Sequence, residues 1–239
     1  HNTVHDPYAA RWDRDRFSGG WFDRAMPDLN QKNPLLANYL IQNALWWVEY
    51  ADLSGIRMDT YSYPDKDFSA RWASRIMTEY PNFNLVGEEY VDNRTMISYW
   101  QKGKVNKDGY VSPLPSLMDF PLHSALVKAL REEESWSGGL KKLYEALSMD
   151  NQYSNPDSLI IMSDNHDMDR LYTQLREDFD LYKMAIAYTL TMRGIPQIFY
   201  GTEILKTNPD GKDDGKIRSD FPGGWAGDQI NAFTGEGLN

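Results

Sequence analysis

Three short stretches decide the fold: GIRMDTYSY (residues 55–63), LVGEEY (85–90) and IMSDNHDMDR (161–170). Each begins with small or apolar residues and leads to an acid, which is typical of a buried parallel strand whose carboxyl end carries chemistry. The acids are Asp59, Glu88 and Asp167. Because they are far apart in the sequence, only a closed or nearly closed sheet brings them together. Several acids on βα units point first to sugar chemistry.

The composition is that of an acidic globular protein. Of the 239 residues, 41% are hydrophobic and 25% are charged, which suits one barrel or one large domain. The net charge of −10 argues against nucleic acid and anionic membranes as partners. No apolar run approaches the roughly 18 residues that a membrane span needs. The absence of cysteine excludes disulfides, zinc–thiolate sites and thiol catalysis, and it leaves the compartment open.

Strand and helix patterns alternate along the chain. Asn33-Pro34 predicts a helix start, with asparagine as N-cap and proline in the first turn. The expected strands begin near Gly55 and cover 85–90, 114–120, 158–163 and 194–203. The expected helices follow Pro34 and cover 67–80, 93–101, 121–134, 140–149 and 179–193. In the helix over 67–80, Phe68, Trp72 and Ile76 share one face. The residues from Lys206 onward, rich in Gly, Asp and Pro, are expected to form a loop.

With its motifs in this order, the chain resembles the catalytic barrel of the α-amylase family of glycoside hydrolases. GIRMDTY, VGEEY and DNHDMDR resemble the family motifs of the fourth, fifth and seventh strands, and GIPQIFYGTE (194–203) resembles the eighth strand. MPDLNQKNP (26–34) resembles a motif at the end of the domain inserted after the third strand. The sequences MPDLN and DFPGGW (220–225) resemble those of the neopullulanase and cyclomaltodextrinase branch of the family. The resemblance implies an α/β fold of the (β/α)8 TIM-barrel type.

The motifs of the first three barrel strands, and the small β-domain that follows a complete barrel of this family, are not found in these residues. We therefore expect a partial barrel of about five βα units, strands four to eight, whose missing half is supplied in cis or by another chain. Three parts are expected. They are the end of the inserted domain (1–33), the second part of the barrel (34–205) and a loop region after strand eight (206–239).

Asp59 is interpreted as the catalytic nucleophile. Arg57 lies two residues earlier, so both side chains project to the same side of a strand. A neighbouring cation keeps a carboxylate ionised, which a nucleophile requires. On spacing alone, a purely structural Arg–Asp pair fits equally well. The resemblance favours the nucleophile.

Glu88 is interpreted as the general acid. Such a group must be protonated, which a poorly solvated position at the end of an apolar strand promotes. Glu89 is the alternative, but strand alternation directs only one of the two inward. The family has Gly-Glu at this position, which selects Glu88. Glu89 is then expected to be a peripheral polar residue or a member of a structural ion pair.

Asp167 ends the tripeptide Asn165-His166-Asp167. The resemblance implies that Asp167 and His166 hold sugar hydroxyls and stabilise the oxocarbenium-like transition state, and that Arg170 supports the same loop. A metallophosphatase is the alternative, but its dimetal site needs several histidines. The chain has four, and three of them, His1, His5 and His123, lie outside any motif. The expected substrate-binding residues are Arg57, His166, Asn165, Tyr63 and Tyr90. Tyr61 is a weaker candidate for a sugar platform.

The resemblance implies a retaining glycoside hydrolase that cleaves α-glucosidic bonds of starch-derived glucans, pullulan or cyclodextrins by double displacement. Its partners would be α-glucan oligosaccharides or polysaccharides. Two alternatives stay open: a transglycosylase using the same residues, and a non-catalytic amylase-like carbohydrate-binding or scaffold protein. The persistence of all three acids argues against inactivity in the parent protein, whereas these residues alone are expected to be at best feebly active. An extracellular or periplasmic location would suit a glucan-degrading enzyme.

No cofactor is required by this chemistry, and calcium lacks a clear site. The segment Asn208–Gly215 is acidic. However, Lys212 and Phe221 fall where an EF-hand loop needs oxygen ligands. We therefore expect a solvated loop here.

Overall fold

The computed structural model describes residues 6–208 and 213–237. The chain folds as two compact units that interleave in the sequence. Unit 1 comprises His1–Pro121, Ser148–Ile160 and Arg193–Ile195, and unit 2 comprises Leu122–Leu147, Ile161–Met192 and Pro196–Asn239. The expected boundaries after residues 33 and 205 stay predictions. Lys212, on which the argument against an EF-hand partly depends, lies outside the described residues.

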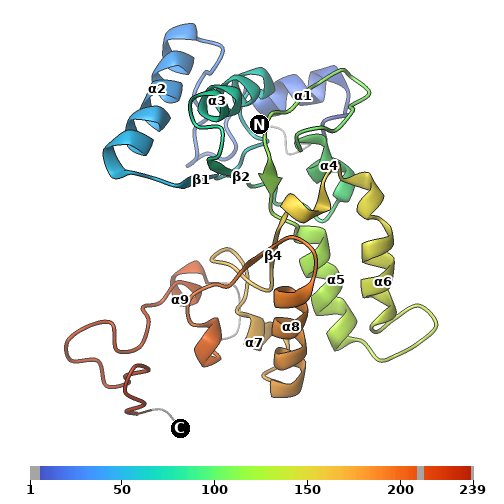
Figure 1. Cartoon of the computed structure of the whole chain (residues 1–239), viewed down its shortest axis with the longest axis vertical. Coiled ribbons are helices and arrows are strands. Elements are labelled where there is room, and N and C mark those ends of the chain that lie inside the picture. Colours follow the sequence, from blue (N-terminus) through green and yellow to red (C-terminus); the bar gives the residue numbers. More distant parts are fainter. Residues whose placement is uncertain (1–5, 209–212, 238–239) are drawn as a thin grey trace. The chain divides into compact units, whose positions relative to one another are not determined.

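Helices and strands alternate along most of the chain (Figure 1). The strands are β1 (Gly55–Met58), β2 (Asn84–Gly87), β3 (Ser116–Leu117), β4 (Ile160–Met162) and β5 (Ile195–Gln197). The helices are α1 (Arg11–Ser18), α2 (Pro34–Ala51), α3 (Lys66–Glu79), α4 (Arg94–Tyr99), α5 (Phe120–Arg131), α6 (Lys141–Ser148), α7 (Leu171–Gln174), α8 (Phe179–Thr191) and α9 (Asp214–Ile217). Short 3-10 helices cover Asp150–Gln152, Pro156–Ser158 and Thr202–Ile204. No helix in the described part of the chain has both the length and the apolar character to cross a membrane.

The strands pair in the order of the sequence. β1, β2 and β3 form a parallel sheet, in which Met58 is aligned with Gly87 and Val86 with Ser116. A single parallel bridge joins Met118 to Ile160 at the start of β4, and β4 pairs with β5. All five predicted strands are therefore present. They are shorter than expected, with two to four residues each.

The helices of unit 1 start where the sequence predicts. Asn33 caps α2, because its side chain accepts a hydrogen bond from the amide of Leu35 at 3.0 Å. α2 lies beside α3 (Figure 1). α3 buries Phe68, Trp72 and Ile76, which confirms the apolar face read from its spacing. These side chains belong to the core of unit 1.

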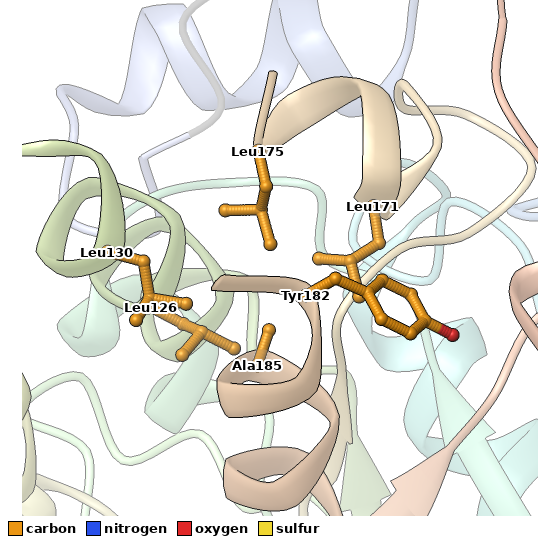
Figure 2. Packing of buried hydrophobic residues seen from close by; sticks show 6 residues of the cluster. All are labelled: Leu126, Leu130, Leu171, Leu175, Tyr182 and Ala185. Atoms are coloured by element: carbon orange, nitrogen blue, oxygen red, sulfur yellow. The ribbon is translucent and has the colours of Figure 1, made fainter. Parts of the chain in front are cut away.

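Unit 2 has an apolar core of its own. Leu126 and Leu130 come from α5, Leu171 from α7, Leu175 from the C-cap of α7, and Tyr182 and Ala185 from α8. Their side chains gather between the helices (Figure 2). Burial of this kind contributes roughly 25 cal/mol per Å² of apolar surface removed from water. The core therefore supports α7, whose N-terminus follows the 161–170 motif directly.

The region after Lys206 differs from its prediction. It contains α9, although its sequence was expected to form only a loop. The side chain of Asp213 caps this helix by accepting hydrogen bonds from the amides of Gly215 and Lys216. A helix of four residues is too short for its periodicity to be visible among glycines and aspartates.

Candidate active site

The ends of β1 and β2 bring Asp59 and Glu88 together. Each follows one of two aligned residues, Met58 and Gly87. The amide of Glu88 donates to the carbonyl of Met58 at 2.9 Å, and the amide of Tyr61 donates to the carbonyl of Glu88 at 2.9 Å. The parallel ladder therefore continues past the strands and fixes the backbone that carries both acids.

One arginine contacts both carboxyl groups. Arg57 Nη1 lies 2.8 Å from Asp59 Oδ1, and its Nη2 lies 2.8 Å from Glu88 Oε1. The amide of Thr60 donates to the other oxygen of Glu88, Oε2, at 3.0 Å. Glu88 thus accepts a bond on each oxygen, and the planar fork of the guanidinium holds the two acids in a fixed relation.

The two acids differ sharply in exposure. The side chain of Glu88 is 5% exposed, whereas that of Asp59 is 63% exposed. Burial, followed by the proximity of Asp59, raises the pKa of Glu88 to about 7 against the lowering effects of the Thr60 amide and Arg57. Glu88 can therefore hold a proton near neutral pH while its neighbour is solvated.

Two backbone features shape this site. A Cβ on Gly87 would lie 2.7 Å from Leu114 Cδ2 and 2.9 Å from the Tyr61 ring, so the close packing beneath Glu88 excludes a larger residue. Thr60 has a φ of 47°, a left-handed conformation that is costly for a β-branched residue. This conformation accompanies the bond from the Thr60 amide to Glu88.

Glu89 is not peripheral, which corrects the first of the two expectations for it, while the structural ion pair stays a prediction. It is fully buried. Burial first, and then the charges of Glu89, Glu88 and Asp59, raise the pKa of Tyr63 to about 12. Strand alternation predicted an outward Glu89 because it assumes a regular strand, but β2 ends at Gly87. The neighbour of the candidate acid is therefore part of the interior.

The three tyrosines of these motifs have different environments. Tyr61 is fully buried and its hydroxyl donates to the carbonyl of Ser69 at 3.3 Å, so it is a core residue and not a sugar platform. Tyr63 packs against the Phe22 ring at 4.6 Å and lines a small cavity of about 120 Å³. Tyr90 is 46% exposed and meets the edge of Phe120. Tyr63 and Tyr90 remain available for contact with a ligand.

In unit 2, Asp167 is held from three directions. Its Oδ1 lies 2.6 Å from Arg218 Nη2, and its Oδ2 lies 3.1 Å from His166 Nε2. Its amide donates to Asn165 Oδ1 at 2.8 Å. Asn165 is 1% exposed, so in this structure it contacts the backbone of Asp167 rather than solvent. A sugar contact for Asn165 stays a prediction.

The segment that carries Asp167 is anchored by two buried charged residues. Arg170 is fully buried, and its guanidinium donates to the carbonyls of Tyr200 at 2.6 Å and Ile217 at 3.0 Å. Asp164, also fully buried, accepts hydrogen bonds from the Leu171 amide and the Thr202 hydroxyl. Burial raises the pKa of Asp164. These contacts agree with the supporting role that the resemblance implies for Arg170.

Sequence reasoning missed three contributors: Thr60, Asp164 and Arg218. Asp164 lies inside a quoted motif, and its position before Asn165 was the only available signal. Arg218 lies 51 residues from Asp167, in a segment expected to be loop, so no local pattern could reveal it. As for metals, the described residues 6–208 and 213–237 contain no group of three or more His, Asp or Glu side chains that could hold an ion.

Known proteins resemble this chain over most of its length. It is 30% identical over 195 residues to a cyclomaltodextrin glucanotransferase of Bacillus licheniformis, covering 81% of this chain and 26% of the relative. It is 26% identical over 190 residues to the intracellular maltogenic amylase of Bacillus subtilis (strain 168), covering 80% and 30%. A crystal structure of an α-amylase from Geobacillus thermoleovorans, complexed with acarbose, superposes with a TM-score of 0.74 at 29% identity, covering 89% of this chain and 46% of that one.

The chain thus spans between a quarter and a third of the length of these curated relatives, and less than half of the Geobacillus structure. The structural likeness confirms an α/β fold that forms part of a (β/α)8 barrel. The sequence model of the α-amylase catalytic domain matches residues 6–229. The chain therefore belongs to the α-amylase catalytic domain family.

Proposed function

We propose that these residues form the acid-bearing part of a retaining glycosidase that acts on α-glucans. Glu88 donates its proton to the glycosidic oxygen while a carboxylate oxygen of Asp59 attacks the anomeric carbon, and the bond from that carbon to the oxygen breaks. Glu88, now ionised, takes a proton from water, which attacks the same carbon and releases Asp59. Asp167 and His166 hold sugar hydroxyls during both steps.

One observation carries this proposal: Arg57 bridges two carboxyls of unequal exposure. The exposed Asp59 beside a cation is suited to attack, and the buried Glu88, with its pKa raised to about 7, is suited to proton transfer. The rule that paired acids divide their roles by environment is general to glycosidases.

The spacing of the pair supports retention over inversion. Inverting enzymes separate their carboxyl groups by about 6.5–9.5 Å to admit a water molecule, whereas retaining enzymes hold them about 5–5.5 Å apart. Asp59 and Glu88 each lie 2.8 Å from a nitrogen of the same guanidinium. A shared guanidinium keeps the two carboxyl groups close, which favours the shorter separation of a retaining enzyme.

The relatives support a glucan as substrate. Those at 29–30% identity include enzymes named for transfer on cyclomaltodextrins and an α-amylase solved with acarbose. A neutral sugar polymer is also compatible with a chain of net charge −10, because it is not repelled. The linkage and the chain length that fit best depend on subsite shape.

Transfer to a sugar acceptor is the second candidate. The match to cyclomaltodextrin glucanotransferases favours it. The first half-reaction is the same, and a sugar hydroxyl replaces water in the second. Product analysis with maltoheptaose separates the two, because transfer yields longer or cyclic products while hydrolysis yields only shorter ones.

The test uses the full-length polypeptide that contains these residues. Asp59→Asn and Glu88→Gln should each abolish turnover of maltooligosaccharides, with Glu89→Gln as the control at the adjacent buried acid. On a maltosyl fluoride, whose leaving group needs no proton, Glu88→Gln should recover much of the first step while Asp59→Asn should not. A fluorinated glycoside should leave a glycosyl adduct on Asp59, detected by mass spectrometry. Near-normal turnover by either variant would reassign its role.

A second test concerns Asp167. A crystal structure of the same polypeptide with an oligosaccharide should have the carboxyls of Asp59, Glu88 and Asp167 around one sugar ring, all within about 12 Å of one another. An ordered complex in which Asp167 lies outside this range would remove it from the site and leave the assignment of the other two intact.

A further inference from the structure

We propose that Arg218 is the positioning residue for Asp167, acting through a clamp that closes the 164–170 segment onto α9. The inference rests on the proposed role of Asp167 in holding sugar hydroxyls. It adds a residue from a part of the chain with no sequence motif for catalysis. Every contact that supports it lies within unit 2.

The clamp consists of the Arg218 guanidinium hydrogen-bonded to two consecutive residues, His166 and Asp167. Arg218 Nε donates to the carbonyl of His166 at 3.0 Å, and Nη2 lies 2.6 Å from Asp167 Oδ1. One bond fixes the backbone and the other fixes the carboxylate, so the Asp167 side chain loses its freedom to rotate. A planar fork can make both bonds at once, whereas an ammonium group offers a single point of charge.

The backbone next to Arg218 is itself held in place by hydrogen bonds. The preceding residue, Ile217, is fully buried, and its carbonyl accepts a bond from Arg170 Nε at 3.0 Å. The backbone amide of Arg170 in turn donates to Asn208 Oδ1 at 2.7 Å. Arg170 and Arg218 therefore tie α9 and the 164–170 segment to each other in both directions. The third contact of Arg218, to Asp214 at 3.3 Å, lies within α9 and is exposed.

The clamp leaves Asp167 usable. The side chain of Asp167 is 28% exposed and that of His166 is 36% exposed, so both can reach a ligand. Arg218 occupies Oδ1 and His166 occupies Oδ2, while each carboxylate oxygen can accept a further bond. A preset carboxylate loses less freedom when the transition state forms, which favours a higher kcat.

The first experiment tests the clamp by amide hydrogen exchange and does not depend on enzymatic activity. Amide hydrogen exchange of residues 165–168 in the full-length polypeptide should become about tenfold faster in Arg218→Ala. Lys216→Ala, on the same helix turn and 53% exposed, is the matched control and should leave the exchange unchanged. Unchanged exchange in Arg218→Ala would overturn the clamp. Arg218→Gln serves as the second variant if the alanine variant does not fold.

The second experiment measures kcat and KM of the full-length polypeptide in a double-mutant cycle. Arg218→Ala should lower kcat roughly 10- to 100-fold with little change in KM. In an Asp167→Asn background it should have almost no further effect, because the group it positions is already disabled. Arg218→Lys should recover part of the loss.

Two results of the double-mutant cycle would also overturn the inference. Additive losses in the cycle, or a change confined to KM, would mean that Arg218 acts on the sugar and not through Asp167. Failure of the proposed function is distinguishable: it appears as normal turnover in Asp59→Asn or Asp167→Asn, whatever the exchange experiment shows.

Discussion

Arginines contact the candidate acids in both units. In unit 1 the arginine is close in sequence to the acid Asp59, whereas in unit 2 it is distant in sequence from Asp167. Arg57 reaches Asp59 from two residues away and meets Glu88 because β1 and β2 are in register. Arg218 reaches Asp167 from 51 residues away, out of a four-residue helix. In the first region the ladder supplies the geometry, and in the second a tertiary contact supplies it.

The difference shows how a site divides its tasks. The strand ends carry one buried and one exposed carboxyl, and backbone hydrogen bonds between the two segments fix their positions. The 164–170 segment carries Asp167, whose carboxylate is held by side-chain contacts. Two arginines support this segment: Arg170 donates to the carbonyl of Ile217, and Arg218 donates to Asp167 Oδ1. Perturbing each region should therefore have different consequences.

The largest expected effect follows from Arg57→Leu. In the full-length polypeptide, kcat should fall by roughly 10³-fold, because both acids lose their shared cation and the pKa of Glu88 rises further. The control is Arg75→Leu, which removes an exposed ion pair on α3 and should leave kcat unchanged. A smaller loss in Arg57→Leu than in Arg218→Ala would reverse the comparison between the two regions.

The next effect is on proton affinity. Carbon NMR of labelled glutamates should give Glu88 a titration midpoint of about 7 in place of its usual 4.5, and Asp59→Asn should lower it by removing a neighbour that raises it. Because the folded pKa lies above the unfolded one, the contribution of Glu88 to stability is fully present below about pH 4.5 and is lost as the pH rises through about 7.

Glu88→Gln should remove this part of the pH dependence of unfolding. A Glu88 midpoint near 4.5 in the wild-type chain would contradict the claim that the strand ends separate the two acids by burial.

A smaller effect concerns packing beneath the acids. Gly87→Ala should destabilise unit 1 by about 1–3 kcal/mol, because its Cβ would meet Leu114 and Tyr61 at less than 3.0 Å. The comparison variant is Gly215→Ala in α9, whose Cβ meets only a side-chain oxygen of Asp213 at 3.3 Å. Urea denaturation followed by tryptophan fluorescence measures both. Equal effects would show that the two regions are packed alike.

The smallest effect is expected at Thr60. Thr60→Gly should raise stability by a few tenths to about 1 kcal/mol, because glycine accepts a φ of 47° without strain and keeps the amide that bonds to Glu88. Thr60→Ala keeps the strain and should show no gain. The measurement is the urea midpoint at constant slope. A loss in Thr60→Gly would show that the threonine side chain contributes more than its backbone costs.

Much of the fold was predictable because its signals are local. The Asn33 cap, the Phe68, Trp72 and Ile76 face of α3 and the five strands follow from short patterns and were found in the structure. The extent of the strands was not predictable. Strand length depends on where the partner strand stops pairing, which the sequence of one strand does not contain.

The candidate site divides in the same way. The positions of Asp59 and Glu88 at strand ends, and the pairing of Arg57 with Asp59, could be read from spacing and from motif likeness. The burial of Glu89 was predicted wrongly, because alternation fails once the chain leaves the strand. The contact from Arg218 could not be predicted, since loop closure over 51 residues has no local signature.

The sequence by itself determined the family of this chain and which acids are candidates for its chemistry. Acids at strand ends, a glycine under the candidate proton donor and an arginine two residues before the candidate nucleophile are properties of short segments, and short segments fix backbone geometry through sterics and hydrogen bonding. Only the tertiary structure decided how each acid behaves. Charge state and orientation depend on burial and on partners brought from distant segments, as the raised pKa of Glu88 and the hold of Arg218 on Asp167 illustrate.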